Sequence, residues 1–248
     1  FTNMKWNKKH IVLSILLPIQ ILLIEWASKH PELIETYYSN GIYRYISKFL
    51  RILFGWLPFS TGDLLMVFGV FILIRFLYRL IRTNFENLIP KTIHFTAVLS
   101  IIYFCFYLLW GMNYYREPLV NSLNFKNQSY STNQLQKVTE TILIHLNESH
   151  SKLTKNDSLK IHVPHSQDEM YTIAMNGYKN LSYDFPQFLY RNPSIKSSLI
   201  SLLQTYNKTS GYLNPFTGEA QVNDKIPKTS YPTTTCHEMA HQIGYAAE

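Results

Sequence analysis

Three long apolar stretches dominate the first half of the chain and constrain what it can fold into. They run from Ile11 to about Ala27, from about Leu64 to Ile81, and from Ile93 to Trp110. Each is close to the ~20 residues that a helix needs to cross a bilayer. The alternatives are buried core helices, or a signal peptide for the first stretch. No small-x-small cleavage site follows the first stretch, and two further stretches do follow, so we expect three membrane-spanning helices.

The chain divides into two unlike halves. The mean hydropathy of −0.08 averages an apolar, aromatic part that ends near Arg116 and a polar remainder rich in Lys, Asn, Ser and Thr. We therefore expect a three-span region over residues 1–116, with an external loop over 28–63, and a separate domain over 117–248. The Lys, Asn and Ile usage is typical of a bacterium.

Basic residues predict how the spans are oriented. Positive charge gathers before the first span and between the second and third, at Lys5, Lys8, Lys9, Arg79, Arg82 and Lys91. Because cytoplasmic loops carry the excess of Lys and Arg, the N-terminus is expected in the cytoplasm. The loop 28–63 and everything after Trp110 are then outside the cytoplasm, at the bacterial inner (cytoplasmic) membrane. An amphipathic segment from Ile42 to Leu53 is expected to lie on the membrane surface.

The net charge of +7 does not indicate nucleic-acid binding. The basic residues form no patch interleaved with aromatic residues, and the sequence has no zinc-finger spacing or recognition helix. We expect no nucleic-acid partner, and we attribute the excess charge to residues that flank the bilayer. The two cysteines, Cys105 and Cys236, lie in apolar patterns and are expected to be free and buried.

The polar half shows alternating signals for helices and short strands. Ser131 to His150 has a helical apolar face, and Ser166 to Glu169 forms a capping box for a helix that continues to about Leu181. Three short strands are also expected. They are Lys160 to Val163, Gly211 to Leu213 and Ala220 to Asn223, the last two flanking a run of turn formers.

Near the end of the chain stands the motif His237-Glu238-Met239-Ala240-His241. Residues four apart lie on one face of a helix, so both imidazoles can point at one metal ion, and Glu238 can hold a metal-bound water. A chance match is expected in roughly one or two of a hundred such sequences, so the motif needs support from its surroundings. The alternative is an ordinary surface helix with two spare histidines.

The surroundings of the motif predict a capped amphipathic helix. Pro232 and the three following threonines are typical of a helix start, with a threonine hydroxyl as the cap. An apolar face recurs at helical spacing, at Cys236, Met239, Ala240 and Ile243. His237 and His241 fall beside this face, and Glu238 is expected further round towards solvent. Gly244 is expected to end or bend the helix.

A catalytic zinc takes three protein ligands and keeps one open position for water. His237 and His241 supply two of these ligands, and Glu248 is the only acidic residue after His241 in the sequence. On a straight helix Glu248 lies ~10 Å along the axis from His241, so it becomes the third ligand only if the chain bends at Gly244. The alternative is a carboxylate that ends the helix or holds a histidine N–H. Glu238 is expected to be the general base.

The expected substrate is a peptide or protein. Ala220, Gln221, Val222 and Asn223 are expected to form an edge strand that pairs with it, with a plain structural hairpin as the alternative. A protease with its site inside the bilayer is disfavoured, because Pro232 and its threonines do not resemble a span. The remaining alternative is a catalytically silent membrane scaffold or sensor with a structural zinc site.

Several segments together resemble an uncharacterised bacterial family of membrane proteins, a domain of unknown function with a zincin-type motif. The resemblance is carried by Leu57-Pro58-Phe59-Ser60, Trp110-Gly111-Met112-Asn113-Tyr114-Tyr115-Arg116, Gly218-Glu219-Ala220-Gln221-Val222-Asn223 and the His237 motif. It implies a metallopeptidase-like site that faces away from the cytoplasm. Family members continue past the equivalent of Glu248 with another acidic residue, so we expect the domain to be truncated at its C-terminal end.

The expected fold is therefore a multi-pass α-helical membrane region followed by an α+β zincin-like metallopeptidase domain that is mainly helical. The expected activity is zinc-dependent (Zn2+) hydrolysis of peptide bonds.

Overall fold

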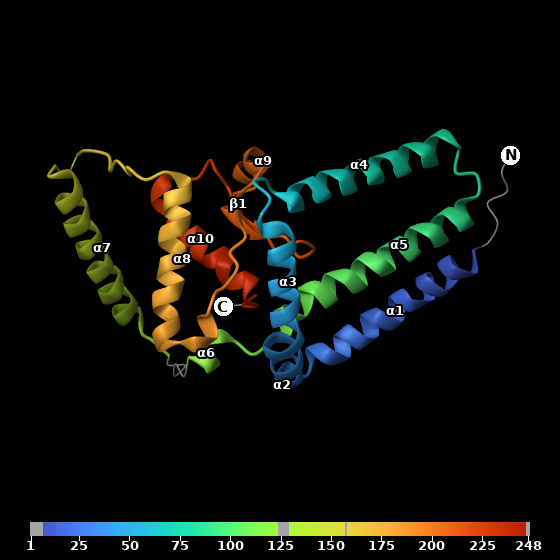
Figure 1. Ribbon diagram of the computed structural model, residues 1–248, viewed down its shortest axis with the longest axis horizontal. Helices are drawn as coiled ribbons and strands as arrows, with labels where there is room; N and C mark the ends of the chain where they lie inside the picture. The colour runs from blue at the N-terminus through green and yellow to red at the C-terminus, as the bar shows by residue number, and fades with distance from the viewer. Residues whose placement is uncertain (1–6, 124–128, 157, 247–248) are drawn as a thin grey trace.

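The computed structural model describes residues 7–123, 129–156 and 158–246. Three long helices extend to one side, and a mixed region of helices and short strands lies at their other end (Figure 1). The helices and strands have the following bounds, where η marks a π-helix (η1) or a 3-10 helix: α1 (Lys8–Ser28), α2 (Pro31–Leu33), η1 (Ile34–Ile42), α3 (Tyr43–Gly55), α4 (Thr61–Arg82), α5 (Leu88–Leu109), η2 (Gly111–Tyr115), α6 (Leu119–Ser122), α7 (Thr132–Thr154), α8 (Gln167–Asp184), η3 (Pro186–Phe188), β1 (Ile195–Ser197), α9 (Ser201–Tyr206), β2 (Gly211–Leu213), β3 (Ala220–Val222), η4 (Lys228–Ser230) and α10 (Tyr231–Gln242).

Helices α1, α4 and α5 coincide with the three predicted spans, and all three are long and apolar enough to cross a membrane. Helices α1 and α5 run side by side in the same direction, and α4 returns in the opposite direction (Figure 1). At one end Ser14 bonds to the carbonyl of Ile93 and accepts a bond from Thr96. Such contacts satisfy polar groups that a bilayer cannot.

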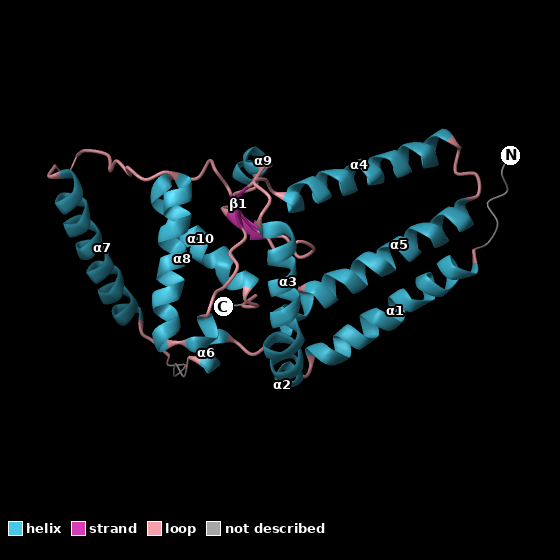
Figure 2. Ribbon diagram, in the orientation of Figure 1, coloured by secondary structure: helices cyan, strands magenta, loops and turns pink. Residues whose placement is uncertain are grey.

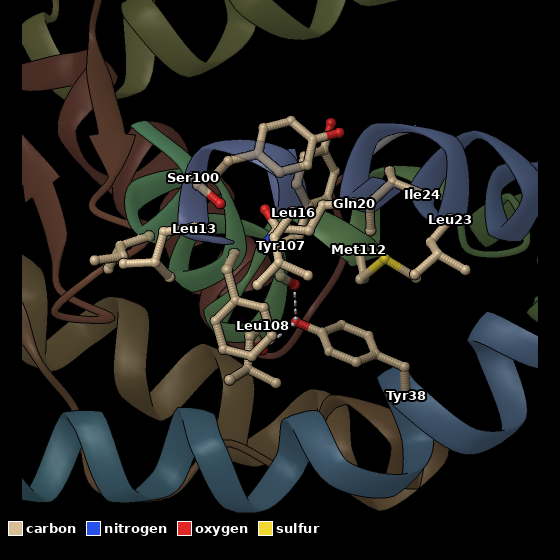
Figure 3. Close-up of a pocket in the computed structure, with 13 residues that line it drawn as sticks. Leu13, Leu16, Gln20, Leu23, Ile24, Tyr38, Ser100, Tyr107, Leu108 and Met112 are labelled. Carbon is tan, nitrogen blue, oxygen red and sulfur yellow. Dashed lines mark hydrogen bonds between the residues drawn. The ribbon is translucent and has the colours of Figure 1, made fainter. Parts of the chain in front are cut away.

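An apolar pocket of 580 Å³ runs along α1 and α5, from Leu13 to Ile24 on α1 and from Ser100 to Leu108 on α5 (Figure 3). The Tyr38 hydroxyl from η1 contacts the end of α5 there, donating to the carbonyls of Tyr107 and Leu108 at 3.1 and 3.0 Å. Helix ends leave carbonyls without partners, so this tyrosine satisfies two of them. The segment between α1 and α4 is therefore fixed to the end of α5.

Helix α3 lies across the ends of the long helices (Figure 1). It is the amphipathic helix predicted from the sequence. Its exposed side carries large apolar residues, Tyr45, Phe49, Ile52, Leu53 and Trp56, and its opposite side is buried against the rest of the molecule through Tyr43, Ser47, Leu50 and Arg51. The sequence predicts that this helix lies on the membrane surface. It does not predict that the side opposite the exposed one packs against the rest of the protein.

A small three-stranded sheet lies between α10 and the start of α4 (Figure 2). The strand order is β1-β3-β2, with β1 parallel to β3 and β2 antiparallel to it. The predicted strands at 211–213 and 220–223 are confirmed, apart from Asn223 at the end of the second. The strand predicted for Lys160 to Val163 is wrong, since this segment pairs with no strand in the part of the chain that the structure describes, and the third strand of the sheet is β1.

Helices α8 and α10 form the core with β3. The Ser166 capping box starts α8 as predicted, and Met170, Ala174 and Tyr178 on its inner face are buried, whereas Ile173 of the predicted face is exposed. Tyr178 also donates to the carbonyl of Cys236 at 2.7 Å. The helix predicted from Ser131 is α7, but all of its predicted apolar face is more than half exposed, at Leu135, Val138, Ile142 and Leu146. Periodicity shows that such a face exists but not what covers it.

Two buried carboxylates join α4 to the sheet. Glu219 accepts from the backbone N–H groups of Thr61 and Gly62 at 3.2 and 2.6 Å, in the first turn of α4. A negative charge is stabilised there by free N–H groups and the helix dipole. Asp63 accepts from Leu199 N at 2.7 Å and from the Tyr212 hydroxyl. The long helix is thus bonded directly to the strands that precede α10.

Gly62 permits this close approach, because a Cβ there would lie 2.6 Å from the Asn214 side chain. Asn214 cannot easily move, since its oxygen accepts from the backbone of Phe216 and Thr217. We expect Gly62→Ala to lower the free energy of unfolding by about 1–3 kcal/mol, measured by thermal unfolding in detergent. Gly69→Ala in the same helix meets nothing within 4 Å and serves as the control. Equal melting temperatures for both variants would contradict this account.

Candidate metal centre

Helix α10 carries the motif and begins at Tyr231, one residue before Pro232. The predicted threonine cap is wrong: Ser230 occupies the cap position without a side-chain bond, and Pro232 lies in the first turn. Proline is favoured there because it has no N–H that needs a partner. The helix ends at Gln242, and Gly244 follows with a positive φ of 97°, as expected of a residue that turns the chain.

The motif residues lie close enough to share one metal ion. His237, Glu238 and His241 each offer a ligand atom, and these atoms all lie within 4.8 Å of one another. The two imidazole centroids are 4.6 Å apart. His241 Nδ1 lies 2.6 Å from the carbonyl oxygen of Tyr245, and a carbonyl only accepts, so Nδ1 carries the hydrogen. That tautomer puts the lone pair on Nε2, which is the arrangement that metal-binding histidines adopt.

Glu238 is buried, with 4% of its surface exposed, whereas His237 beside it is exposed. The prediction that Glu238 faces solvent is therefore wrong, because the sheet covers that side of α10. Its Oε2 atom has no hydrogen-bond partner among the described residues. Burial without a compensating bond disfavours the charged form and raises the pKa of the carboxyl to about 8.

Gly211 in β2 allows the sheet to approach Glu238. A Cβ at this position would lie 2.9 Å from Cγ and Oε1 of Glu238 and 2.8 Å from the carbonyl of Gln221. Any side chain would therefore displace the carboxylate or the neighbouring strand. The contact between Gly211 and Glu238 was not predicted. The one signal for it in the sequence is a glycine at the start of a very short strand, which often marks a close approach of the backbone to another group.

A cleft of 270 Å³ opens beside the motif between β2 and the first half of α10. It is lined by Ser210, Gly211, Thr233, Thr234, His237 and Glu238. The imidazole of His237 and the carboxyl of Glu238 therefore share one cleft, whose opposite wall is a strand.

The strand that forms this wall is β2 and not the predicted 220–223. Ala220, Gln221, Val222 and Asn223 are almost fully buried, and β3 is the central strand with neighbours on both sides. The prediction of an edge strand there is wrong, because β1 covers the side that was expected to be free. Asn223 instead supports the fold by donating to the carbonyl of Thr209 at 3.0 Å.

In β2 the free backbone groups belong to alternate residues. Backbone bonds from Asn223 N to Ser210 O and from Asn214 N to Glu219 O mark the positions that face β3. In an antiparallel pair the intervening residues point outward, so Gly211 and Leu213 direct N–H and C=O groups away from β3, to a side where no strand among the described residues pairs with them. Gly211 is partly exposed there, whereas Leu213 is buried against Tyr43 and Trp110. This edge begins at the residue that contacts Glu238.

Glu248, the predicted third ligand, lies outside the described residues. Within the described part of the chain, the cluster consists of His237, Glu238 and His241, with no further His, Cys, Asp or Glu in range. The reversal at Gly244 does bend the chain after His241, as the prediction for Glu248 required.

The C-terminal end of α10 is held by side chains from the segment between α1 and α4 and from the end of α5. The Gln242 carbonyl accepts from Tyr43 at 3.1 Å, from Arg51 at 3.0 Å and from Ser47. The His241 carbonyl accepts from Trp110 Nε1 at 3.1 Å. These donors satisfy carbonyls that have no partner within the helix. The residue that carries the second imidazole is thereby fixed to α3 and to the end of α5.

Two further side chains fix the turn that follows. Arg116 donates to the Gly244 carbonyl at 2.9 Å, pairs with Glu35 at 2.6 Å and lies 4.2 Å over the Tyr245 ring. The Gln242 side chain donates to the carbonyl of Gly218 at 2.7 Å. The turn that presents the Tyr245 carbonyl to His241 is therefore held by groups distributed over the whole chain.

The fold and the site define a mainly helical protein with three helices able to cross a membrane, a small three-stranded sheet and a His/Glu/His cluster at a cleft. The chain belongs to the family described as Protein of unknown function (DUF3810), which it matches over residues 38–248. The match includes α3, the sheet and the whole of α10. Comparison with curated proteins gives no match, and neither does comparison with solved structures.

The raised pKa of Glu238 predicts how stability depends on pH in the metal-free protein. The folded chain keeps this proton up to a pH of about 8, and the unfolded chain releases it near 4.5. Stability is therefore lost as pH rises through this window, by at most about 1.4 kcal/mol per pH unit, and the loss ends above pH 8. Glu238→Gln removes this dependence, so its melting temperature should exceed that of the wild type by a margin that grows with pH.

The measurement is thermal unfolding in detergent with a chelator, from pH 5 to 9. Glu140→Gln, at an exposed site in α7, is the matched control and should follow the wild-type curve. Parallel curves for Glu238→Gln and the wild type would show that the buried carboxyl does not titrate as described.

Proposed function

We propose that this protein is a membrane-anchored zinc-dependent metallopeptidase that hydrolyses peptide bonds with a metal-activated water. The observation that carries the proposal is that His237, Glu238 and His241 bring ligand atoms within 4.8 Å of one another, beside a cleft that His237 and Glu238 line. The buried carboxyl and the fixed histidine tautomer support it, because an ordinary surface helix needs neither. A zincin-like domain outside the cytoplasm, anchored to the bilayer by three spans with the N-terminus inside, is part of the same proposal.

His237 and His241 are the proposed imidazole ligands, and Glu248 is the proposed third. The donor set favours zinc, for which imidazole and carboxylate are common ligands. Bound there, Zn2+ supplies a Lewis acid that polarises the scissile carbonyl and acidifies water. The Tyr245 carbonyl holds the His241 ring through Nδ1, which directs Nε2 as the ligand atom.

Glu238 is the proposed general base. Its carboxyl lies in the cleft beside His237 and has one oxygen without a partner among the described residues, so it is able to accept a proton from the attacking water. It then donates that proton to the leaving amine. Nearby positive charge favours the ionised carboxylate, so metal binding is expected to release a proton.

The free edge of β2 is the proposed substrate strand, in place of 220–223. An extended peptide that pairs with β2 at Gly211, which lines the cleft, gains backbone hydrogen bonds without any requirement on its sequence. Pairing at Gly211 places the peptide beside Glu238, because the two residues are in contact. A peptide at this edge therefore lies beside Glu238 and His237, which line the same cleft.

The alternative is a catalytically silent membrane scaffold or sensor with a structural zinc site. Its supporting observation is that α10 is bonded at its end to α3 and α5, so that a metal on α10 adds rigidity where these elements meet. The two proposals differ in the role of Glu238, which only the peptidase requires to be ionisable.

Glu238→Gln should lower peptide cleavage by about a hundredfold or more, because general-base catalysis contributes on this scale, and should leave zinc content unchanged. His237→Ala and His241→Ala should each lose both zinc and cleavage. The measurements are zinc per chain by elemental analysis and hydrolysis of a fluorogenic peptide library by protein in lipid vesicles. His145→Ala, an exposed histidine of α7, is the control. Full cleavage by Glu238→Gln would favour the scaffold.

Gly211→Ala tests whether the contact between β2 and the base matters for turnover. The added methyl group meets Glu238 Cγ and Oε1 at 2.9 Å and should displace the carboxyl, lowering kcat by about tenfold or more while zinc is retained. Gly177→Ala in α8 meets nothing within 4 Å and controls for the loss of a glycine. Unchanged kcat in Gly211→Ala would contradict the proposed position of the base.

A further inference from the structure

A second polar pocket, distinct from the metal centre, lies between α3 and the segment 186–191. It has a volume of 320 Å³ and shares no lining residue with the cleft at His237. Four basic residues line it: Arg44, Lys48, Arg51 and Arg191. No Asp or Glu is among the described residues that line this pocket, so no carboxylate in its wall balances the positive charge of the four basic side chains.

The four cations differ in what they already bind. Arg51 is buried and committed to the structure, since it donates to the carbonyls of Asn192 and Gln242 and lies 5.4 Å over the Tyr190 ring. The side chain of Arg44 donates to Asn40 at 3.3 Å, a neutral partner on the same stretch of chain. In the part of the chain that the structure describes, neither Arg44, Lys48 nor Arg191 forms an ion pair. Three exposed cations therefore converge without a counter-charge.

The position of these cations on α3 indicates where their ligand comes from. Successive residues of a helix turn by about 100°, so Phe49, Ile52 and Trp56 share the exposed apolar face of α3. Arg44 and Lys48 fall about a quarter turn away, between that face and the side buried against α10. A helix of this kind lies in the membrane interface with its apolar face inserted and its cations at the level of the headgroups.

The orientation of α3 agrees with that placement. It crosses the ends of the three long helices instead of continuing one of them (Figure 1). Helices α1, α4 and α5 are long and apolar enough to cross a membrane, so the plane of α3 coincides with the boundary where these helices emerge.

We propose that the pocket formed by Arg44, Lys48, Arg51 and Arg191 binds a phosphate group, and that its source is the headgroup of an anionic phospholipid. Guanidinium groups bind phosphate oxygens through paired N–H donors, and Lys48 adds a mobile charge. A zwitterionic headgroup carries its own cation and gains less from a pocket with four. The bound lipid would fix α3, and through Arg51 the end of α10, at a set height above the bilayer. This proposal does not depend on peptidase activity.

The test uses the triple variant Arg44→Gln, Lys48→Gln, Arg191→Gln, which leaves Arg51 and its structural bonds intact. The control is Lys137→Gln, Lys152→Gln, Lys179→Gln, which removes the same charge from exposed positions on α7 and α8. Native mass spectrometry of the full chain in detergent measures retention of phosphatidylglycerol against phosphatidylcholine of equal chain length. A parallel titration with inorganic phosphate uses the melting temperature as readout.

Each basic residue near an anionic lipid contributes about fivefold in affinity, so we expect the triple variant to retain phosphatidylglycerol at least tenfold more weakly than the wild type and the control. The wild type, the triple variant and the control variant should retain phosphatidylcholine equally. A second outcome is that inorganic phosphate stabilises the wild type but not the triple variant, while the wild type retains phosphatidylglycerol and phosphatidylcholine equally. That outcome would overturn the lipid as the source of the phosphate and would indicate a soluble phosphate compound instead. Equal retention of phosphatidylglycerol by both variants, with no effect of phosphate, would overturn the site itself.

Discussion

The carbonyl groups at the end of α10 impose the constraint on which the rest of the structure depends. A helix leaves its last carbonyls without partners, and inside a protein they must find donors. Here Tyr43, Ser47 and Arg51 come from the loop after the first long helix, and Trp110 from the end of the third. Because these donors surround His241 and Gln242, the candidate metal centre is assembled by the region that precedes it in sequence.

Glu219 and Glu238 are both buried, and they show how different surroundings give two identical side chains different roles. Glu219 accepts from backbone N–H groups at the start of α4 and from Thr217, and so it joins the sheet to a long helix. Glu238 lies against Gly211 with one oxygen lacking any partner among the described residues, and burial raises its pKa. A carboxylate surrounded by donors is structural, whereas one that is buried without them is suited to exchange a proton.

Much of the secondary structure followed from local patterns. The three apolar stretches, the Ser166 capping box and the turn-flanked strands near 211 and 220 all depend on short-range physics, namely length, capping and turn chemistry. The errors share a different origin. Glu238 was assigned to solvent and 220–223 to a sheet edge because helical and strand periodicity cannot show which neighbour arrives from elsewhere. Those neighbours are strand β2, which covers Glu238, and strand β1, which covers β3, and neither adjoins in sequence the segment that it covers.

The sequence by itself determined that three helices are long and apolar enough to cross a membrane and that α3 is amphipathic. It also determined that His237 and His241 share one helical face. All three follow from the length of an apolar stretch or from the 3.6-residue repeat, which are properties of the local chain. Only the tertiary structure decided that Glu238 is buried, that β2 and not β3 borders the cleft, and that Arg51 and Trp110 hold the end of α10. These features arise where segments distant in sequence satisfy one another's backbone groups, and no local pattern encodes which segments will meet.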